Sequence, residues 1–515
     1  MPNRSTDALF QLVKSLEKSE KRNFKLYVTR NTDADDLKIV QLFDVLDKLN
    51  SYDEKQLLEK AKSISKQQLS NIKASLYKEI LSSLRLIKDD DNIDIQLHEQ
   101  MDHARILYNK GLHLQSLHVL DRMKKLATAH NQVTYLVQIL FFEKKIESLY
   151  ITRSLENRAD VLIQEAKTAI GKLNNVSILS NLALKLYGWY IRNGHARTEQ
   201  DDAEVKRIFD EGLPVDITHC NSFYEKLYLF QSYCWYAFIR QDFLMYYRYT
   251  QKWVDLFTTE PLMIAVETAH YIKGMHNLMG AHFDLRNYKK LLQTLQQFEA
   301  FAQTDVVLRN ENNRIQTFAY LYISKLNKHF LEGTFTDGLQ LVPDIEKRLK
   351  EYELYLDRHR VLVFYYKIAS LYFGSGDNSG AIDYLNRIIN WKVDLRTDLQ
   401  CYSRLLHLIA HYELGNFDLM EYLIKSVYRF MAKMENLSVV EEEMFRFLRQ
   451  SFKLSAKNIK PELEKLLQKL QQHEDNRLEN RAFMYLDVIS WLESKISGVP
   501  VQEVIRGKFL AMGKG

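Results

Sequence analysis

Proline and glycine are scarce in this chain: its 515 residues include only 6 prolines and 17 glycines. An all-β protein needs turn residues about every 8–12 positions, and a doubly wound α/β protein needs glycine-rich loops after its strands. A disordered or fibrous chain is rich in proline, glycine or polar tracts. Because 46% of the residues are apolar, a core can form. We therefore predict a long, all-α protein.

Cysteines and long apolar runs are also rare. Cys220, Cys234 and Cys401 are too few and too scattered for a disulfide framework or a structural zinc site. The chain opens without the apolar segment of a signal peptide, and no run reaches the roughly 18–20 apolar residues of a membrane helix. We expect free thiols, no membrane contact and a cytoplasmic location. The net charge of +5 does not by itself indicate a nucleic-acid partner.

Turn-forming residues recur along most of the chain. They stand near positions 111, 154, 194, 241, 286, 333, 376 and 415. The clearest unit runs from Val363 to Lys392 and turns at Gly376-Asp377. Its small or apolar positions are Tyr365, Ile368, Ala369, Tyr372, Ala381, Leu385 and Ile388. The spacing predicts two antiparallel helices whose backbones approach closely at the small residues.

This unit resembles the tetratricopeptide repeat, although Val393 stands where the family has proline. The interval of about 40–47 residues exceeds the 34 of the standard repeat, so HEAT-like units stay an alternative. The resemblance implies a right-handed superhelical solenoid of paired helices with a concave face. We expect the array to span residues 96–455.

Residues 1–95 lack the repeat and are predicted to form an N-terminal helical bundle. Its expected helices are Thr6–Tyr27, Asp36–Asn50, Lys55–Lys62 and Lys66–Ile87. The segments at 15–30 and 76–87 resemble the opening of uncharacterised repeat proteins of Bacteroidota, a group that implies architecture and no activity. Asp89, Asp90 and Asp91 are predicted to form a solvated linker. Residues 456–515 are predicted to form C-terminal capping helices, the second of them spanning 482–496.

The first helix of each tetratricopeptide pair faces the concave side, so helical spacing predicts a groove. The predicted groove residues are Arg105, Lys145, Lys185, Trp235, Lys273, His276, Asn277, Asn327 and Lys367. A basic stripe in a curved channel focuses positive potential. We therefore expect a protein or peptide partner with acidic groups or a free C-terminal carboxylate. Solvated lysines on a helix face are the alternative interpretation.

No catalytic constellation stands out in the sequence. His407 and His411 share a helix face, but position 408 is Leu and no third metal ligand is evident. The segment Gly374–Gly380 lacks the preceding strand and following lysine of a phosphate loop. Cys220 next to His219 has no orienting carboxylate. We expect no metal, no cofactor and no enzymatic activity.

The sequence thus favours a cytosolic interaction scaffold that binds a peptide or protein segment. The alternative is a regulator whose N-terminal bundle binds DNA or a signalling protein while the repeats sense a peptide. A helix beginning near Asp53 and a recognition helix over Gln67–Leu81 would form a helix-turn-helix. The order of parts resembles that of Gram-positive peptide-sensing regulators. A purely structural bundle is the competing interpretation of the same helices.

Overall fold

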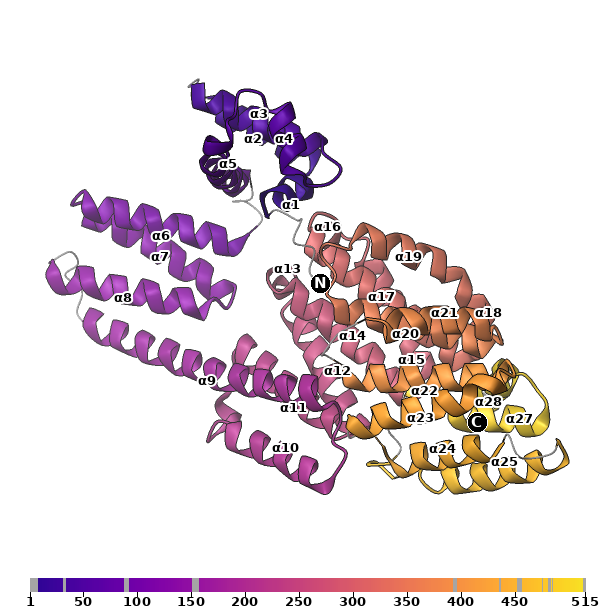
Figure 1. The fold of residues 1–515 in the computed structure, drawn as a ribbon. Coiled ribbons are helices and arrows are strands. Elements are labelled where there is room, and N and C mark those ends of the chain that lie inside the picture. The colour runs from indigo at the N-terminus through magenta and orange to yellow at the C-terminus, as the bar shows by residue number, and fades with distance from the viewer. Residues whose placement is uncertain are drawn as a thin grey trace. The chain divides into compact units, whose positions relative to one another are not determined.

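The computed structural model describes residues 8–30, 34–87, 92–150, 157–391, 396–434, 437–451, 456–474, 476–479, 483 and 485–512. Within these residues, every regular element is an α-helix or a short 3-10 helix (Figure 1). The predicted all-α class is therefore confirmed. None of the described helices combines the length and apolarity needed to cross a membrane. The predicted linker Asp89–Asp91, the turn near 154 and Val393 lie outside the described residues.

Contacts between residues divide the chain into two compact units, Met1–Lys167 and Thr168–Gly515. The helix α9 (Arg158–Asn193) begins in the first unit and ends in the second. The predicted boundaries near residues 95 and 455 rest on sequence pattern and stay predictions.

The first unit consists of helices that pack around two small cores. The helices before α9 are α1 (Ala8–Ser15), α2 (Lys18–Val28), α3 (Ala34–Lys48), α4 (Glu54–Lys60), α5 (Lys66–Ile87), α6 (Ile93–Asn109), α7 (His113–Ala129) and α8 (Val133–Leu149). The prediction of one helix over Thr6–Tyr27 is wrong. Glu17 is extended and forms a capping box with Glu20, which ends α1 and begins α2.

The second unit contains the remaining helices that the structure describes. They are α10 (Glu199–Gly212), η1 (Ile217–His219), α11 (Phe223–Ile239), α12 (Phe243–Thr259), α13 (Leu262–Val266), α14 (Thr268–Asp284), α15 (Tyr288–Phe301), α16 (Asp305–Leu308), α17 (Glu311–Glu332), α18 (Phe335–Gly338), η2 (Leu339–Leu341), α19 (Val342–Glu351), α20 (Arg358–Ser375), α21 (Asn378–Ile389), α22 (Thr397–Glu413), α23 (Phe417–Lys433), α24 (Val439–Ser451), α25 (Ala456–Gln471), α27 (Val488–Ser497) and α28 (Val501–Met512). Most contacts join helices that are close in sequence.

Left-handed residues mark the predicted turns. Positive φ angles occur at seven of the eight predicted positions, Gly111, Gly194, Gln241, Arg286, Gly333, Gly376 and Gly415. Other described residues with positive φ are Asn131, Asn157, Arg396 and Gly498. At Gly376, φ is 91° and α20 ends; the side chain of Asp377 then accepts from the Gly380 N–H at 2.9 Å and caps α21. Glycine tolerates this conformation, which costs other residues about 1–2 kcal/mol.

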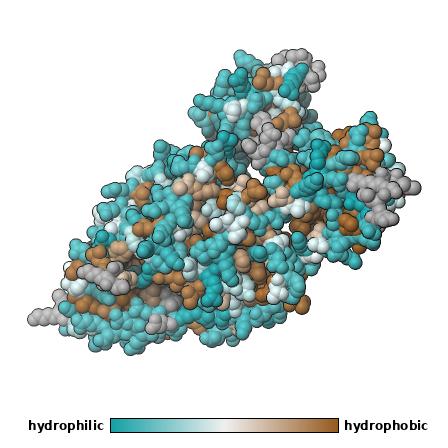
Figure 2. Space-filling model, turned by 180° about the vertical axis from the view of Figure 1, so that it is seen from behind, coloured by the Kyte–Doolittle hydropathy of each residue, from teal (hydrophilic) through white to brown (hydrophobic). Residues whose placement is uncertain are grey.

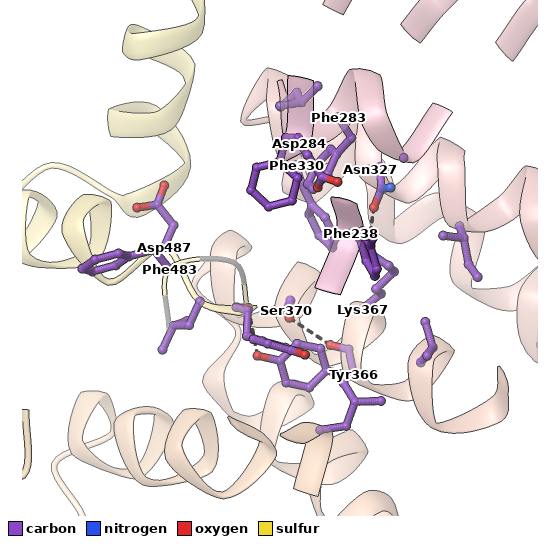
Figure 3. Close-up of a pocket in the computed structure, with 18 of the residues that line it drawn as sticks. Phe238, Phe283, Asp284, Asn327, Phe330, Tyr366, Lys367, Ser370, Phe483 and Asp487 are labelled. Carbon is purple, nitrogen blue, oxygen red and sulfur yellow. Dashed lines mark hydrogen bonds between the residues drawn. The ribbon is translucent and has the colours of Figure 1, made fainter. Parts of the chain in front are cut away.

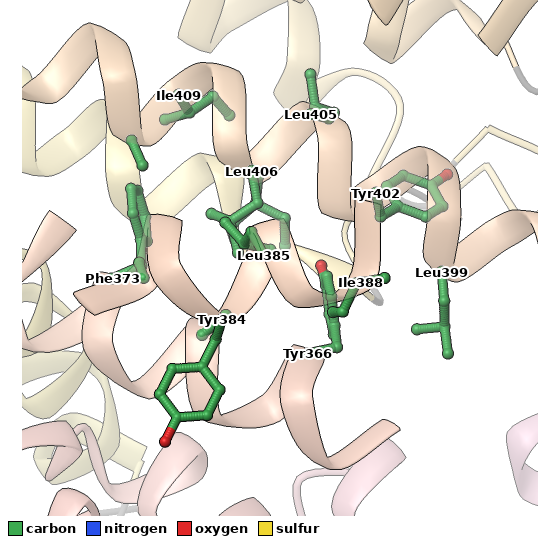
Figure 4. Packing of buried hydrophobic residues seen from close by; sticks show 14 of the residues in the cluster. Tyr366, Phe373, Tyr384, Leu385, Ile388, Leu399, Tyr402, Leu405, Leu406 and Ile409 are labelled. Carbon is green, nitrogen blue, oxygen red and sulfur yellow. The ribbon is translucent and has the colours of Figure 1, made fainter. Parts of the chain in front are cut away.

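Two small residues lie where α6 and α7 touch. In the first unit, the Ser116 hydroxyl donates to the Ala104 carbonyl at 2.8 Å, and both residues are fully buried. In the second unit, the largest core cluster runs from α17 to α27. Figure 4 shows Leu385 and Leu406 facing each other within it. The surface in Figure 2 is mostly hydrophilic, with apolar side chains scattered over it.

The C-terminal residues pack back onto much earlier helices of the second unit. The Gln241 side-chain amide donates to the Arg477 carbonyl at 2.8 Å, and the Tyr366 hydroxyl donates to the Tyr485 carbonyl at 2.9 Å. Helix α28 contacts both α17 and α20. The sequence predicted one helix over residues 482–496. Helix α27 instead begins at Val488, because the Asp487 side chain accepts from the Ser490 N–H and caps the start of this helix. We call residues 474–512 the C-terminal segment.

Candidate functional site

A cavity of about 1370 Å³ lies within the second unit. Helices α11, α14, α17 and α20 form much of its wall, and the end of α9 adds to it. The C-terminal segment supplies another part of the wall. Figure 3 shows Phe483 and Asp487 of this segment across the cavity from Asp284 and Phe330. The hollow is therefore bounded by residues that are far apart in the sequence.

Six of the nine predicted groove residues line this cavity: Trp235, Lys273, His276, Asn277, Asn327 and Lys367. The other three do not. Arg105 and Lys145 are exposed and belong to the first unit, where Lys145 lies over the Tyr108 ring. Lys185 is exposed on α9 and is not part of the cavity wall.

Sequence reasoning missed several polar residues of the wall. Tyr320 and Arg360 stand seven positions before Asn327 and Lys367, and Asp284 stands seven after Asn277. Seven residues are about two helical turns, so each missed residue lies on the same helix face as a predicted one. Extending the predicted stripe by one heptad along each helix would have found all three.

Aromatic side chains dominate the wall. Among the described lining residues, sixteen are aromatic: Tyr187, Tyr190, Trp235, Phe238, Phe243, Tyr246, Phe283, Tyr288, Tyr320, Phe330, Phe335, Tyr366, Phe373, Phe483, Tyr485 and Phe509. The described wall also carries seven Lys and Arg side chains but only four Asp and Glu side chains. Aromatic rings offer large, rigid contact areas to a ligand, and the excess of cations makes the cavity favour negative charge.

Lys367 and Asp284 form one charged group in the wall. Lys367 Nζ donates to Asn327 Oδ1 at 2.6 Å and lies 5.1 Å from the centre of the Phe330 ring (Figure 3). Burial raises the pKa of Asp284 to about 7, although Lys367 opposes this shift. Burial likewise lowers the pKa of Lys367 to about 8, against the pull of Asp284. Both groups thus titrate near neutral pH.

A second charged group surrounds Tyr320. Lys273 Nζ lies 5.2 Å from the centre of the Tyr320 ring, and Arg360 Nη2 donates to its hydroxyl at 3.3 Å. His276 stacks on the same ring at 4.0 Å. Burial, with Lys273, Lys367 and Arg360 adding to it, holds the pKa of His276 well below its usual value. This imidazole is therefore neutral at neutral pH.

Arg396 belongs to a third charged group, in which Asp398 neutralises its charge. Its guanidinium makes two short bonds to Asp398, Nε to Oδ1 at 2.8 Å and Nη2 to Oδ2 at 2.7 Å. The Tyr485 hydroxyl donates to the same carboxylate at 2.5 Å, which fastens the C-terminal segment to α22. Burial and the nearby Arg396 lower the pKa of His359 to about 4.

The arrangement is suited to holding a ligand. Cys234 lines the cavity, but burial raises the pKa of its thiol well above the usual value, so its nucleophilic thiolate form is disfavoured. In the described part of the chain, no group of three His, Cys, Asp or Glu residues has metal-binding geometry. What the wall offers is aromatic surface with a few converging polar groups, the usual chemistry of a binding pocket.

No known protein-family model matches the sequence, and no curated protein is similar to it at a significant level.

Proposed function

We propose that this protein is a non-enzymatic, cytoplasmic interaction scaffold that binds a peptide or protein segment in the cavity of its second unit. In this proposal the helices form a tetratricopeptide-like superhelical array related to repeat proteins of Bacteroidota. The observation that carries the proposal is the cavity wall itself: six predicted groove residues, from four helices, converge on one aromatic-lined hollow.

Two further observations support the proposal. Left-handed residues stand at seven of the eight turns that the repeat pattern predicts, and in a repeat array each first helix contributes to a common face. Trp235 and several tyrosines line the cavity, and these residue types are enriched among the anchors of protein interfaces.

Capture of random peptides displayed on phage tests this proposal. Gly280 lines the cavity, and a Cβ built on it meets no atom within 4 Å, so Gly280→Phe fills the hollow without a clash at Cβ. Gly188 has equally open surroundings but is not part of the wall, so Gly188→Phe is the matched control. We expect the wild type and Gly188→Phe to bind the same peptides and Gly280→Phe to lose them. Recovery of no peptide, or equal binding to all three proteins, contradicts the proposal.

The predicted alternative, a DNA-binding regulator, is kept as a second candidate because of α4 and α5. The two helices are separated by five residues, and Gln67 and Asn71 are exposed on α5. Ser65 and Gln68 instead hydrogen-bond each other's backbone N–H at the start of α5. Fluorescence anisotropy with duplex DNA at increasing salt tests this candidate. Binding that weakens linearly on a log–log plot supports it, and no binding at low salt removes it.

A further inference from the structure

We propose that helix α28 is a lid on the cavity of the second unit, and that the lid detaches to admit the ligand. This inference rests on the proposed function and names the control of the same site. Helix α28 is the last helix that the structure describes. It contacts α17 and α20, which belong to the cavity wall, and a connection of three residues, 498–500, joins it to α27.

The first argument is the position of α28 between the cavity and the solvent. Five of its residues line the cavity: Val501, Ile505, Lys508, Phe509 and Met512. Most of these positions are three or four residues apart, so they share one face of the helix. Glu503, Gly507 and Leu510, on the opposite face, are exposed. Helix α28 is therefore a single layer between the hollow and the solvent, and its detachment opens the wall along its length.

The second argument is the attachment of α28, which is weaker than that of α27. No side chain of α28 is buried, whereas α27 buries several, among them Trp491. Polar bonds join α28 to α17 and α18. Arg506 Nη1 donates to the Glu332 carbonyl at 3.2 Å, and the Thr336 hydroxyl donates to Gln502 Oε1 at 2.9 Å. Detaching α28 therefore exposes less apolar surface than detaching α27, and costs less free energy.

The third argument is the connection between the two helices. Gly498 ends α27 with a φ of 75°, and no described atom lies within 4 Å of a Cβ built on it. Helix α27 itself is fixed, because the Trp491 indole N–H donates to Glu413 at 2.7 Å and Lys495 Nζ lies 2.9 Å from the same carboxylate. A glycine with open surroundings next to an anchored helix can serve as a hinge. Helix α28 can thus move away while α27 stays in place.

A lid of this kind lowers the apparent affinity of the cavity for its ligand. Only the molecules in which α28 is detached bind, so the apparent dissociation constant is the intrinsic one divided by their fraction. Loosening α28 without changing the wall should therefore tighten binding. Arg506→Ala and Gln502→Ala each remove one bond of α28, and neither residue lines the cavity.

Binding of the dye anilinonaphthalene sulfonate to the full-length protein tests the lid. The dye is an aromatic anion that reports accessible apolar surface, and it suits a wall of aromatic and cationic side chains. We expect Arg506→Ala and Gln502→Ala to bind it about three- to tenfold tighter than the wild type. Arg207→Ala, which removes an exposed arginine outside the cavity, is the control and should change nothing. Adding Gly280→Phe to Arg506→Ala should abolish the gain, because the hollow is then filled.

Hydrogen exchange of residues 501–512 reports on the lid directly. It should become faster in Arg506→Ala and Gln502→Ala, while the exchange of α27 stays unchanged. Unchanged exchange of residues 501–512 in both variants overturns the inference. Faster exchange without tighter dye binding overturns it as well, as does a gain that survives the addition of Gly280→Phe. If the dye shows the lid but no peptide is captured from phage, the lid stands and the proposed function fails.

Discussion

Asp284 and Lys367 both line the cavity, and each side chain titrates close to neutral pH. Burial raises the pKa of Asp284 from about 4 to about 7, so the folded state binds this proton more tightly than the unfolded state. The stabilisation is complete below about pH 4 and is lost as the pH rises to about 7. A charged Asp284 is thus tolerated in the cavity only at the expense of folding stability.

Asp284→Asn should remove this pH dependence. Between pH 4 and pH 7, the stability of the variant relative to the wild type should rise by up to about 1.4 kcal/mol per pH unit. Urea unfolding of both proteins across this range measures the difference, which cancels the contributions of the buried histidines. Asp383→Asn on α21, where the carboxylate is exposed, is the control. Parallel curves for the wild type and Asp284→Asn contradict the assignment.

For single residues, helical spacing in the sequence predicts which helix faces meet. It does not predict which charged side chains pair across those faces. Helical spacing from Ala369 predicted Lys367 as a groove residue, and the structure places it in the cavity wall. Its neighbours Asn327 and Asp284 stand about 40 and 83 positions earlier, on other helices. No local pattern specifies such a meeting, because it depends on the tertiary packing of α14, α17 and α20.

Among the elements, α28 makes one very close approach to an earlier part of the chain. A Cβ built on Gly333 would lie 2.5 Å from the backbone nitrogen of Arg506, so the backbone of α28 packs directly on this glycine. Thr336 and Gln502 add a hydrogen bond of 2.9 Å between their side chains. None of the side chains of α28 is buried. The helix is therefore held by surface contacts, among them the hydrogen bond from Arg506 Nη1 to the Glu332 carbonyl at 3.2 Å and the Lys508–Glu493 ion pair at 2.7 Å.

Gly333→Ala should displace α28 while leaving the rest of the second unit folded. Hydrogen exchange of residues 501–512 should become faster, because the added methyl group collides with the α28 backbone. Gly376→Ala is the matched control: its φ is also positive, at 91°, but no atom lies within 4 Å of its Cβ. Both variants carry about 1–2 kcal/mol of backbone strain. Equal exchange of α28 in the two variants would show that the close approach is unimportant.

Helix boundaries could be read from the sequence where glycine or a capping residue marks them. Gly111, Gly333 and Gly376 end their helices as predicted. The break at Glu17 escaped prediction because neither proline nor glycine marks it and both flanking segments favour helix. The contacts of α28 with α17 escaped prediction as well, since Glu332 and Arg506 are 174 positions apart in the sequence.

For the whole molecule, the division into two units predicts more than one unfolding transition. Contacts within Met1–Lys167 and within Thr168–Gly515 define two units, and α9 runs from the first into the second. Differential scanning calorimetry of the intact chain should therefore resolve two components. A single two-state transition would contradict this division.

A substitution in a buried ion pair of the first unit can show which of the two calorimetric transitions belongs to that unit. Glu143 is fully buried, and its carboxylate lies 2.6 Å from Lys124 Nζ and 3.3 Å from Arg158. Lys124→Met leaves this carboxylate with a single cation, which should lower one transition by roughly 5–10 °C. The other transition should not move. Lys145→Met, at an exposed position of the same unit, should change neither, and an equal shift of both transitions would rule out independent units.

The return of the C-terminal segment sets an order of events during synthesis. A ribosome completes α11, α14, α17 and α20 well before residues 474–512 leave its exit tunnel. Until then, the bonds from Arg477 to Gln241 and from Tyr485 to Tyr366 cannot form. The nascent chain thus passes through a stage in which the aromatic and charged wall is open on the side that residues of the C-terminal segment later cover.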